Sequence, residues 1–505
     1  MLISIITTVI LFPFNFFFQQ QNNMAKNIEH FIIASLLSFL FFSNRKVFWE
    51  LLYSKEDKAI NIIENKIGSS VAHFSNVGVG VNANIDLIVS ALQVFSNLQL
   101  ESHLVSKDHP SISTLEELEE CFYFYFKKCA AAERVVTSKS LFDQIIQAAK
   151  KTPNAQYDVG GNAALISLKL AAMGNNTKVL LGGPVGPKLE SLLGNRIIIP
   201  SSMKQDHDEY HLIMEYKKGD IWGDHTSLCA NRFIITHDKA NSEMQAMDKF
   251  FESLISFKPD LIIVSGLHLL ESQPPNVIEK KLNAFRTHLQ NVPSTTPIHL
   301  ELASMTSVQL TKDIANQIFP VVDSIGLNEQ ELAFLSTSLN GPGSPNELAQ
   351  WPPEIGLMAD IIDWLFQFYG RNTRYGSDSS RLTRIHFHCL TYHLMAVFPE
   401  YWNNSLAATV AGSRTASTQA CDKEKLISFD VELRIPKVFA RSVHFWELRR
   451  YLVKQEEGNP VTSWSHNGVD YNFCAVLVCK EAKKTVGLGD SISAVGLQYS
   501  DFIYN

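Results

Sequence analysis

The stretch VGLGD at residues 486–490 lies near the end of the chain and runs into SISAVGL at 491–497, which reads as a helix. Two glycines before an acid let backbone N–H groups approach an anion closely. The start of the helix adds unpaired donors and a partial positive charge. Beside a phosphate, Asp490 can take the proton of an attacking hydroxyl. The stretch therefore predicts phosphoryl transfer, although a tight turn with Asp490 as a helix cap accounts for the same residues.

Working outward, short apolar runs recur between helical patterns, as expected for the buried strands of a parallel sheet. They are LIIVSG (261–266), IHLELA (298–303), SIGL (324–327) and AVLVC (475–479), and residues 71–90 predict one first strand. Residues 158–183 read as a glycine turn, a helix, a second turn and a strand. This alternation predicts an α/β protein with a doubly wound, mostly parallel sheet.

Ligands of open α/β sheets bind where strands end. Glu301 lies on or just after one predicted strand, Asn328 follows the SIGL strand, and Gly487 follows the final strand region. We therefore expect these three segments to converge in space although they are far apart in the sequence.

The composition excludes several classes of protein. The chain has 505 residues, 46% of them hydrophobic, and a net charge of -7. Without a basic stripe, nucleic acid is not expected as a partner. The seven cysteines form no Cys-x-x-Cys pair, so a zinc site is not expected. There is neither a Walker A pattern nor a protein-kinase signature set.

The N-terminus is strongly apolar. Residues 1–18 and 31–42 are two hydrophobic runs, so we interpret 1–48 as a signal or anchor segment, with membrane anchoring through 1–42, and 49–505 as the globular part. This segment predicts localisation to the endoplasmic reticulum or the secretory pathway. The sequence leaves open whether the segment is cleaved or remains as an anchor, and whether the globular part faces the lumen or the cytosol. In that compartment the sequons at Asn175 and Asn403 become relevant, and Cys421–Cys479 is the preferred disulfide.

From about residue 70 onward, the chain resembles the animal-type ADP-dependent glucokinases of the ribokinase-like superfamily. The segments that carry the resemblance are VGVGVNANIDLI (77–88), DVGGNAALIS (158–167), GDHTSLCANRFIITHD (223–238), IHLELAS (298–304), IGLNEQEL (325–332), LTRIHFH (382–388), AGSRTASTQAC (411–421) and VCKEAKKTVGLGD (478–490). The resemblance implies that ADP and D-glucose give AMP and glucose 6-phosphate with Mg2+. It also implies a monomer with a ribokinase-like large domain and a smaller inserted α/β lid, its pieces roughly at 87–115 and 203–235.

The resemblance also implies residue roles. Asp490 would be the general base, the backbone of Gly487, Leu488 and Gly489 would bind the transferring phosphoryl group, and Arg232 would reach the ADP phosphates. The remaining positions are implied for the sugar (Asn82, Asp86, Gly160, Gly161, Asn162 and His268), for the nucleotide (His388 and Val478), for the metal (Glu301, Glu331 and Asp490) and for support of the metal site (His299 and Asn328).

Structural interpretations stay open beside these roles. Arg232 fits a surface salt bridge, Asp86 a strand-end cap and Glu331 a solvated acid in a first helical turn. Two other functions also stay open. An ATP-dependent sugar or nucleoside kinase of the same superfamily would use the same base and anion site. A membrane-tethered, non-catalytic sensor or scaffold would need no base, and an intact Asp490 argues against it.

Overall fold

The computed structural model describes residues 54–68, 74–100, 105–174, 176–371, 379–443, 452–484 and 486–504. The predicted signal or anchor segment 1–48 and the sequon residue Asn175 lie outside these ranges. None of the helices within them combines the length and the apolar character needed to cross a membrane.

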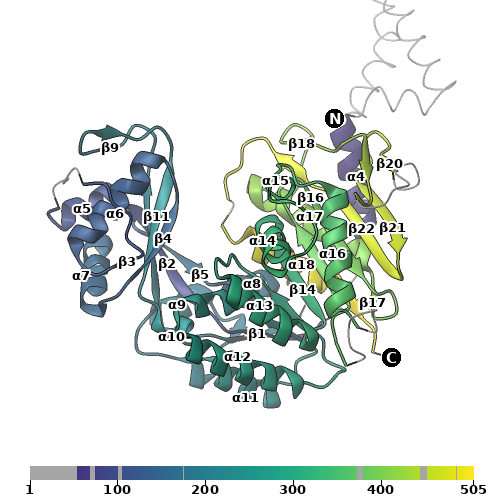
Figure 1. Cartoon of the computed structure of the whole chain (residues 1–505), viewed down its shortest axis with the longest axis horizontal. Coiled ribbons are helices and arrows are strands. Elements are labelled where there is room, and N and C mark those ends of the chain that lie inside the picture. The colour runs from purple at the N-terminus through teal and green to yellow at the C-terminus, as the bar shows by residue number, and fades with distance from the viewer. Residues whose placement is uncertain are drawn as a thin grey trace, which may run out of the picture.

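The larger domain is built on one sheet (Figure 1). Its strands, in spatial order, are β21 (Val461–His466), β22 (Val469–Ala475), β16 (Tyr392–Val397), β15 (Arg384–His388), β14 (Ser324–Asn328), β13 (Ile298–Glu301), β12 (Leu261–Val264), β1 (Asn76–Gly80), β6 (Lys178–Gly182) and β7 (Ile197–Ile198). The strands from β15 to β7 run parallel, and β16, β22 and β21 continue the sheet antiparallel.

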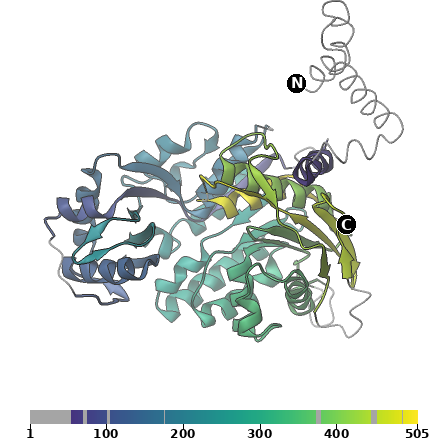
Figure 2. The same ribbon diagram turned by 90° about the horizontal axis from the view of Figure 1, so that it is seen from above.

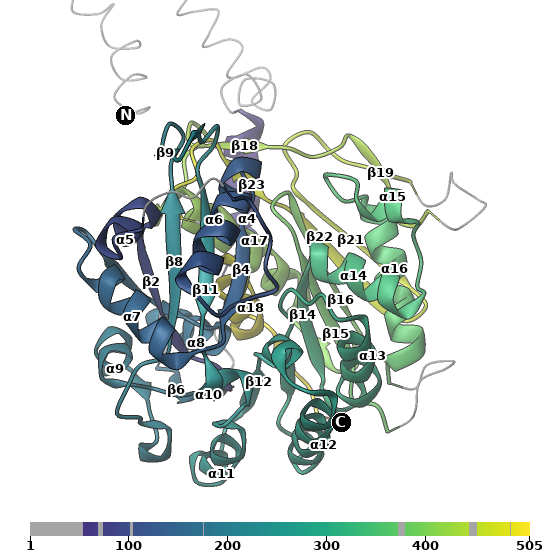
Figure 3. The same ribbon diagram turned by 60° about the vertical axis from the view of Figure 1, so that its left-hand side comes forward.

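Helices cover both faces of this sheet (Figure 3). One layer contains α4 (Lys55–Ile67), α8 (Asn162–Ala172), α17 (Ser405–Cys421) and α18 (Leu488–Gln498). The other contains α11 (Met247–Phe257), α12 (Pro275–Gln290), α13 (Val308–Gln317), α14 (Glu329–Leu339) and α16 (Ile355–Tyr369). All residues of β12 and β13 are buried between the layers, as continuous apolar runs require. The predicted α/β, doubly wound fold is confirmed.

A smaller domain stands to one side of the larger one (Figures 1 and 2). Its sheet has the spatial order β3 (Ser111–Ile112), β4 (Ala132–Val136), β11 (Asn231–Thr236), β8 (Tyr210–Tyr216), β2 (Asn84–Ser90) and β5 (Gln156–Gly160). One face packs on α5 (Ala91–Asn97), α6 (Leu115–Lys128) and α7 (Lys139–Lys150) through an aromatic core around Phe122. The other face carries the half-exposed side chains of Asp86 and His211.

The boundaries of several elements differ from the sequence predictions. The single strand predicted over 71–90 is two strands, because the chain leaves the larger sheet after Gly80 and enters the smaller one at Asn84. The smaller sheet also reaches β5 at Gly160, whereas the first predicted lid piece ends at 115. The amphipathic patterns of α6 and α7 require a sheet to pack against, but they do not specify which one.

The last predicted strand is also divided. β22 ends at Ala475, and β23 (Leu477–Cys479) pairs instead with β18 (Val431–Leu433). Within the polar segment 341–353, Pro345–Leu348 form the short helix α15.

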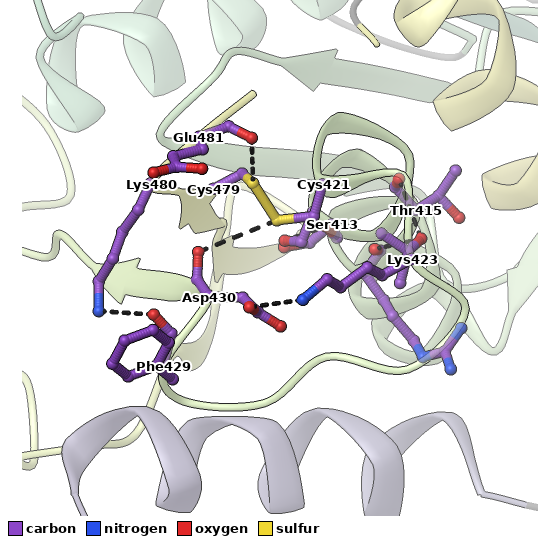
Figure 4. Close-up of a disulfide and its surroundings, with 12 residues drawn as sticks. Ser413, Thr415, Cys421, Lys423, Phe429, Asp430, Cys479, Lys480 and Glu481 are labelled. Atoms are coloured by element: carbon purple, nitrogen blue, oxygen red, sulfur yellow. Dashed lines mark hydrogen bonds and ion pairs between the residues drawn. A yellow bond between two sulfur atoms is a disulfide. The ribbon is translucent and has the colours of Figure 1, made fainter. Parts of the chain in front are cut away.

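The predicted disulfide Cys421–Cys479 is confirmed, and it joins the end of α17 to β23 (Figure 4). A second disulfide, Cys129–Cys229, lies in the smaller domain and was not predicted. Each domain therefore contains one covalent cross-link, and the three remaining cysteines are buried thiols.

Candidate active site

The segments expected to converge meet at one edge of the larger sheet. Glu301 ends β13, Asn328 ends β14, and the turn at Gly487 precedes α18. The start of α8 lies beside them, since the Asn162 Nδ2 donates a hydrogen bond of 2.9 Å to the Asp490 Oδ1. The sheet edge thus gathers an acid, an amide and a helix N-terminus in one place.

Asp490 is the central acid of this group. It is only 7% exposed, and it stands in the first turn of α18 rather than at the N-cap, which is Gly487. Its role as a helix cap is therefore not supported by the structure. The pKa of Asp490 is raised to about 7 by burial first and by the nearby Glu301 carboxylate second, while the Asn162 hydrogen bond opposes the shift. The carboxyl is thus poised to exchange a proton near neutral pH.

The turn before Asp490 presents backbone donors. Gly487 has a φ of +64°, a left-handed conformation that glycine adopts easily. Within the described residues no side chain caps the start of α18. The first N–H groups of a helix lack partners inside the helix. Around Leu488 and Gly489 they are thus free to bind an anion.

Two more buried carboxylates face this turn. The Glu301 Oε2 lies 3.0 Å from the His299 Nε2, and the Glu301 Oε1 lies 4.0 Å from the His388 Nε2. Although burial raises the pKa of Glu301, the hydrogen bond from His299 and the nearby imidazole of His388 lower it to about 2. Glu331 closes a capping box, accepting hydrogen bonds from the Asn328 backbone N–H at 2.8 Å and Nδ2 at 2.9 Å. Burial raises the pKa of Glu331 to about 7.

Glu301 and Glu331 are the carboxylates expected to bind a metal ion. Within the described ranges, no group of three or more metal-ligating side chains is arranged to hold an ion. Glu301 and Glu331 are instead held by His299 and Asn328, the two residues expected to support them. Their oxygens suit Mg2+, which usually keeps waters and binds through one or two carboxylates plus phosphates. The donor set therefore fits an ion brought in with phosphates rather than a preformed cage.

Two of the predicted sugar residues, Asn82 and Asn162, are linked to Asp490 by hydrogen bonds. The Asn82 Oδ1 accepts hydrogen bonds from the Ala163 N–H at 3.2 Å and the Ser265 hydroxyl at 2.9 Å, and the Asn82 Nδ2 donates to the Asn162 Oδ1 at 3.3 Å. Together with the bond from Asn162 to Asp490, this forms a continuous polar chain. It joins the crossing between the two domains to the central acid.

Asp86, on β2, is the predicted sugar-binding side chain that belongs to the smaller sheet. Its Oδ1 accepts a hydrogen bond of 2.8 Å from the Asn84 Nδ2, and burial raises its pKa. A Cβ at Gly160 would overlap the Asp86 carboxylate, and a Cβ at Gly161 would crowd the backbone of Ala83. The two glycines thus allow strand β5 to approach these polar groups closely.

A histidine that was not predicted stands next to Asp86. His211 pairs with Asp86 in the register of β2 and β8, and its Nε2 lies 3.1 Å from the Asp238 Oδ2. Burial lowers the pKa of His211, but Asp238 outweighs it and raises the pKa to about 9. His268, in the 3-10 helix η2 (Leu267–Ser272), has its pKa lowered to about 4 by burial and by His211. Its Nδ1 has no hydrogen-bond partner within the described residues.

Arg232 and the two predicted nucleotide residues, Val478 and His388, lie in three separate places. Arg232 is exposed on β11 and, by strand register, shares the face of Asp86 and His211. Val478 is half-buried on β23, where it pairs with Glu432. His388 lies against Glu301 and close to Gly489, so it belongs to the carboxylate cluster.

Sequence reasoning missed several buried or half-buried polar groups at this edge and on the facing side of the smaller domain. They are Asn84, His211, Asp238, Ser265, Arg384, His386 and His393. The period-two pattern of RIHFH, which places Arg384 and His386 on the same face of β15 as the predicted His388, was the only signal for these two residues. The partners Asp238 and Ser265 lie on other elements, so no spacing pattern indicates them.

Comparisons with known proteins agree with this geometry. Residues 75–499 match the conserved region of ADP-specific phosphofructokinases and glucokinases. The chain is 44% identical to the ADP-dependent glucokinase of Bos taurus over 84% of each chain. It is 36% identical to a probable ADP-dependent glucokinase of Caenorhabditis elegans over 89% of this chain and 90% of that one.

Solved structures share the fold. The last common ancestor of ADP-dependent phosphofructokinases from Methanosarcinales superposes with a TM-score of 0.62 at 17% identity, covering 88% of this chain and 97% of that one. A phosphofructokinase from Pyrococcus horikoshii with AMP gives a TM-score of 0.60 at 17% identity, covering 85% and 98%.

Proposed function

Because the chain belongs to the family of ADP-specific phosphofructokinases and glucokinases, we propose that it is an ADP-dependent glucokinase, transferring the β-phosphoryl group of ADP to the 6-hydroxyl of D-glucose. The products are AMP and glucose 6-phosphate, which feeds glycolysis. The family contains phosphofructokinases and glucokinases, and the similarity to two glucokinases supports glucose as the acceptor of this chain. The observation that carries the chemistry is the buried Asp490, hydrogen-bonded to Asn162 at the N-terminus of α18.

The proposed mechanism uses groups already in place. Asp490 accepts the proton of the sugar 6-hydroxyl as its oxygen attacks the β-phosphorus. Asn162 holds the carboxylate in one orientation through its 2.9 Å hydrogen bond. The N–H groups around Leu488 and Gly489 bind the phosphoryl oxygens as negative charge accumulates on them.

We propose Mg2+ as the cofactor. Glu301 and Glu331 would hold it through water molecules. Asp490 would be a third ligand, since it lies close enough to Glu301 and Glu331 for their charges to raise its pKa. When bound, Mg2+ neutralises part of the charge on the nucleotide phosphates. Support comes from three clustered carboxylates, since Glu301 raises the pKa of both Asp490 and Glu331.

The smaller domain is proposed to close over the sugar. Asp86 and His211 line its open face, and Arg232 stands on the same face. Closure would bring the Arg232 guanidinium, a strong phosphate donor, to the ADP phosphates and would exclude water that could otherwise hydrolyse ADP.

The direct test is glucose 6-phosphate formation with Mg2+, comparing ADP with ATP as donor and fructose 6-phosphate with D-glucose as acceptor. We expect activity with ADP and D-glucose and little with the other pairs. Activity with ATP alone would show that ATP, not ADP, is the donor. Activity with fructose 6-phosphate alone would show that fructose 6-phosphate, not D-glucose, is the acceptor. A protein that binds AMP but transfers nothing would favour the non-catalytic alternative.

We also propose that the protein enters the secretory pathway as a monomer, through the signal or anchor segment 1–48. The two disulfides support an oxidising compartment, and Asn403 of the second sequon is exposed. Treatment of the cell-expressed protein with an N-glycosidase should increase its gel mobility, and Asn403→Gln should remove part of the shift. An unshifted protein with free thiols would contradict this localisation.

A further inference from the structure

A groove of about 590 Å³ lies on the outer side of the helical layer that contains α8, α17 and α18. Figure 3 shows these helices on one side of the larger sheet. Leu165, Leu168 and Ala172 of α8 form an apolar wall, and Val486 and Gly487 close one end. Its volume falls within the range of small-molecule sites. We call it the α8–α17 groove.

Positive charge collects in this groove. Four basic side chains line it, with Asp422 and Glu424 as the acidic ones; the basic residues are Lys169, Arg414, Lys423 and Lys484. The Arg414 Nε lies 2.6 Å from the Glu64 Oε1, and the Lys423 Nζ lies 2.6 Å from the Asp430 Oδ1 (Figure 4). Within the described part of the chain, neither Lys169 nor Lys484 has a carboxylate within ion-pairing distance.

Lys169 is held against other cations. Its side chain is half-buried on α8, and burial lowers its pKa, as do the charges of Arg414 and Lys484. Such an arrangement is unfavourable without a counter-charge. A bound anion would relieve both the repulsion and the desolvation of Lys169.

We propose that the α8–α17 groove is a second ligand site, which binds the phosphate group of a small phosphate monoester between Lys169 and Lys484. The Ser491 hydroxyl adds a donor at the same end, and the apolar wall of Leu165 and Leu168 accommodates the carbon part of the ligand. Asp490, Asn162 and Glu301 do not line the groove, which meets the catalytic edge only at the turn that contains Gly487.

The position of the groove also gives it a route to the catalytic turn. The Gln419 Nε2 donates a hydrogen bond of 3.2 Å to the Val486 carbonyl, immediately before Gly487. Leu165 packs close to the Cα of Gly487. An occupant therefore contacts the residues that hold the phosphate-binding turn in position.

The test uses pyridoxal 5′-phosphate, which carries both a phosphate and an aldehyde. The unprotonated Lys169 amine attacks the aldehyde carbon, an imine forms with loss of water, and borohydride then delivers hydride to give a stable secondary amine. Peptide mass spectrometry of the full chain locates the label. We expect Lys169 to be labelled ahead of the exposed lysines, and we expect most of that label to be lost when inorganic phosphate or glycerol 3-phosphate is in excess.

Controls make the outcome decisive. Lys169→Gln should remove the protected label, whereas Lys178→Gln, an exposed lysine outside the groove, should leave it unchanged. Stronger protection by glycerol 3-phosphate than by inorganic phosphate would support binding of an ester, and equal protection would support binding of the phosphate group alone. The proposal is overturned if Lys169 reacts no faster than Lys178, or if sodium chloride at matched ionic strength protects equally well.

Discussion

The two domains prepare their functional groups in different ways. In the larger domain, the acids are already held: Asp490 by Asn162, Glu301 by His299 and Glu331 by Asn328. In the smaller domain, Arg232 is exposed and has no side-chain partner among the described residues. The difference indicates that the chemistry is preorganised on the larger domain, while the smaller domain contributes groups that act only when it closes.

The largest expected effect is at the preorganised acid. Asp490→Asn keeps the shape and the hydrogen bond from Asn162 but removes the base, so we expect kcat to fall about 10²–10⁴-fold. Steady-state rates of glucose 6-phosphate formation measure this loss. Asp422→Asn, at an exposed helix end, serves as the matched control and should retain activity. A fall of less than tenfold in the Asp490 variant would show that another group takes the proton.

A smaller effect is expected at the exposed arginine. Arg232→Ala removes charge-assisted hydrogen bonds to phosphate, so kcat/KM for ADP should fall roughly 10- to 100-fold. Because the side chain is exposed, the melting temperature should stay unchanged. Arg286→Ala, at another exposed arginine on α12, should alter neither quantity. An unchanged kcat/KM for Arg232→Ala would remove the phosphate role of the smaller domain.

The disulfides allow the domains to be compared by stability. Replacing Cys421 and Cys479 by serine opens a 58-residue loop in the larger domain, and replacing Cys129 and Cys229 opens a 100-residue loop in the smaller one. Each change should lower the stability of its own domain by about 2–4 kcal/mol. Thermal melts followed by limited proteolysis would show which domain opens first. Identical cleavage patterns for the two variants would mean that the domains unfold together.

The smallest effect is a dependence of stability on pH. The folded pKa of Asp490 is raised from 3.8 to about 7, so its contribution to stability is complete below about pH 4 and is lost as the pH rises to about 7. Asp490→Asn carries no such penalty. In the absence of nucleotide and metal, it should therefore be more stable than the wild type at pH 8, by roughly 1–3 kcal/mol, and similar at pH 4. Denaturant unfolding at the two pH values measures this difference. If the wild type is more stable than the Asp490→Asn variant at pH 8, the expectation that Asp490 is buried and holds its proton is contradicted.

The same carboxyl predicts a kinetic profile. Since the base must be ionised, kcat/KM should rise with pH through about 7. A profile that stays flat from pH 5 to 8 would mean that Asp490 titrates well below its expected range.

The sequence predicted the features of the fold and of the site that depend on short local patterns. The apolar runs of β12 and β13 and the turn at 486–490 are each contained in a few adjacent residues. The crossing between the domains was missed because the apolar alternation of 71–90 continues through Asn82 without a turn signal. The His211–Asp238 pair could not be predicted either, since it depends on the packing of separate elements.

A crystal structure with D-glucose and AMP bound would test the contrast between the domains most directly. The account predicts that the distance from the Asn162 Nδ2 to the Asp490 Oδ1 stays near 2.9 Å while the smaller sheet moves as a unit and brings Arg232 to the phosphate side of AMP. If the Asp490 carboxylate rearranges, or the smaller domain stays in place with Arg232 still exposed, preorganisation on the larger domain and closure of the smaller one would be contradicted.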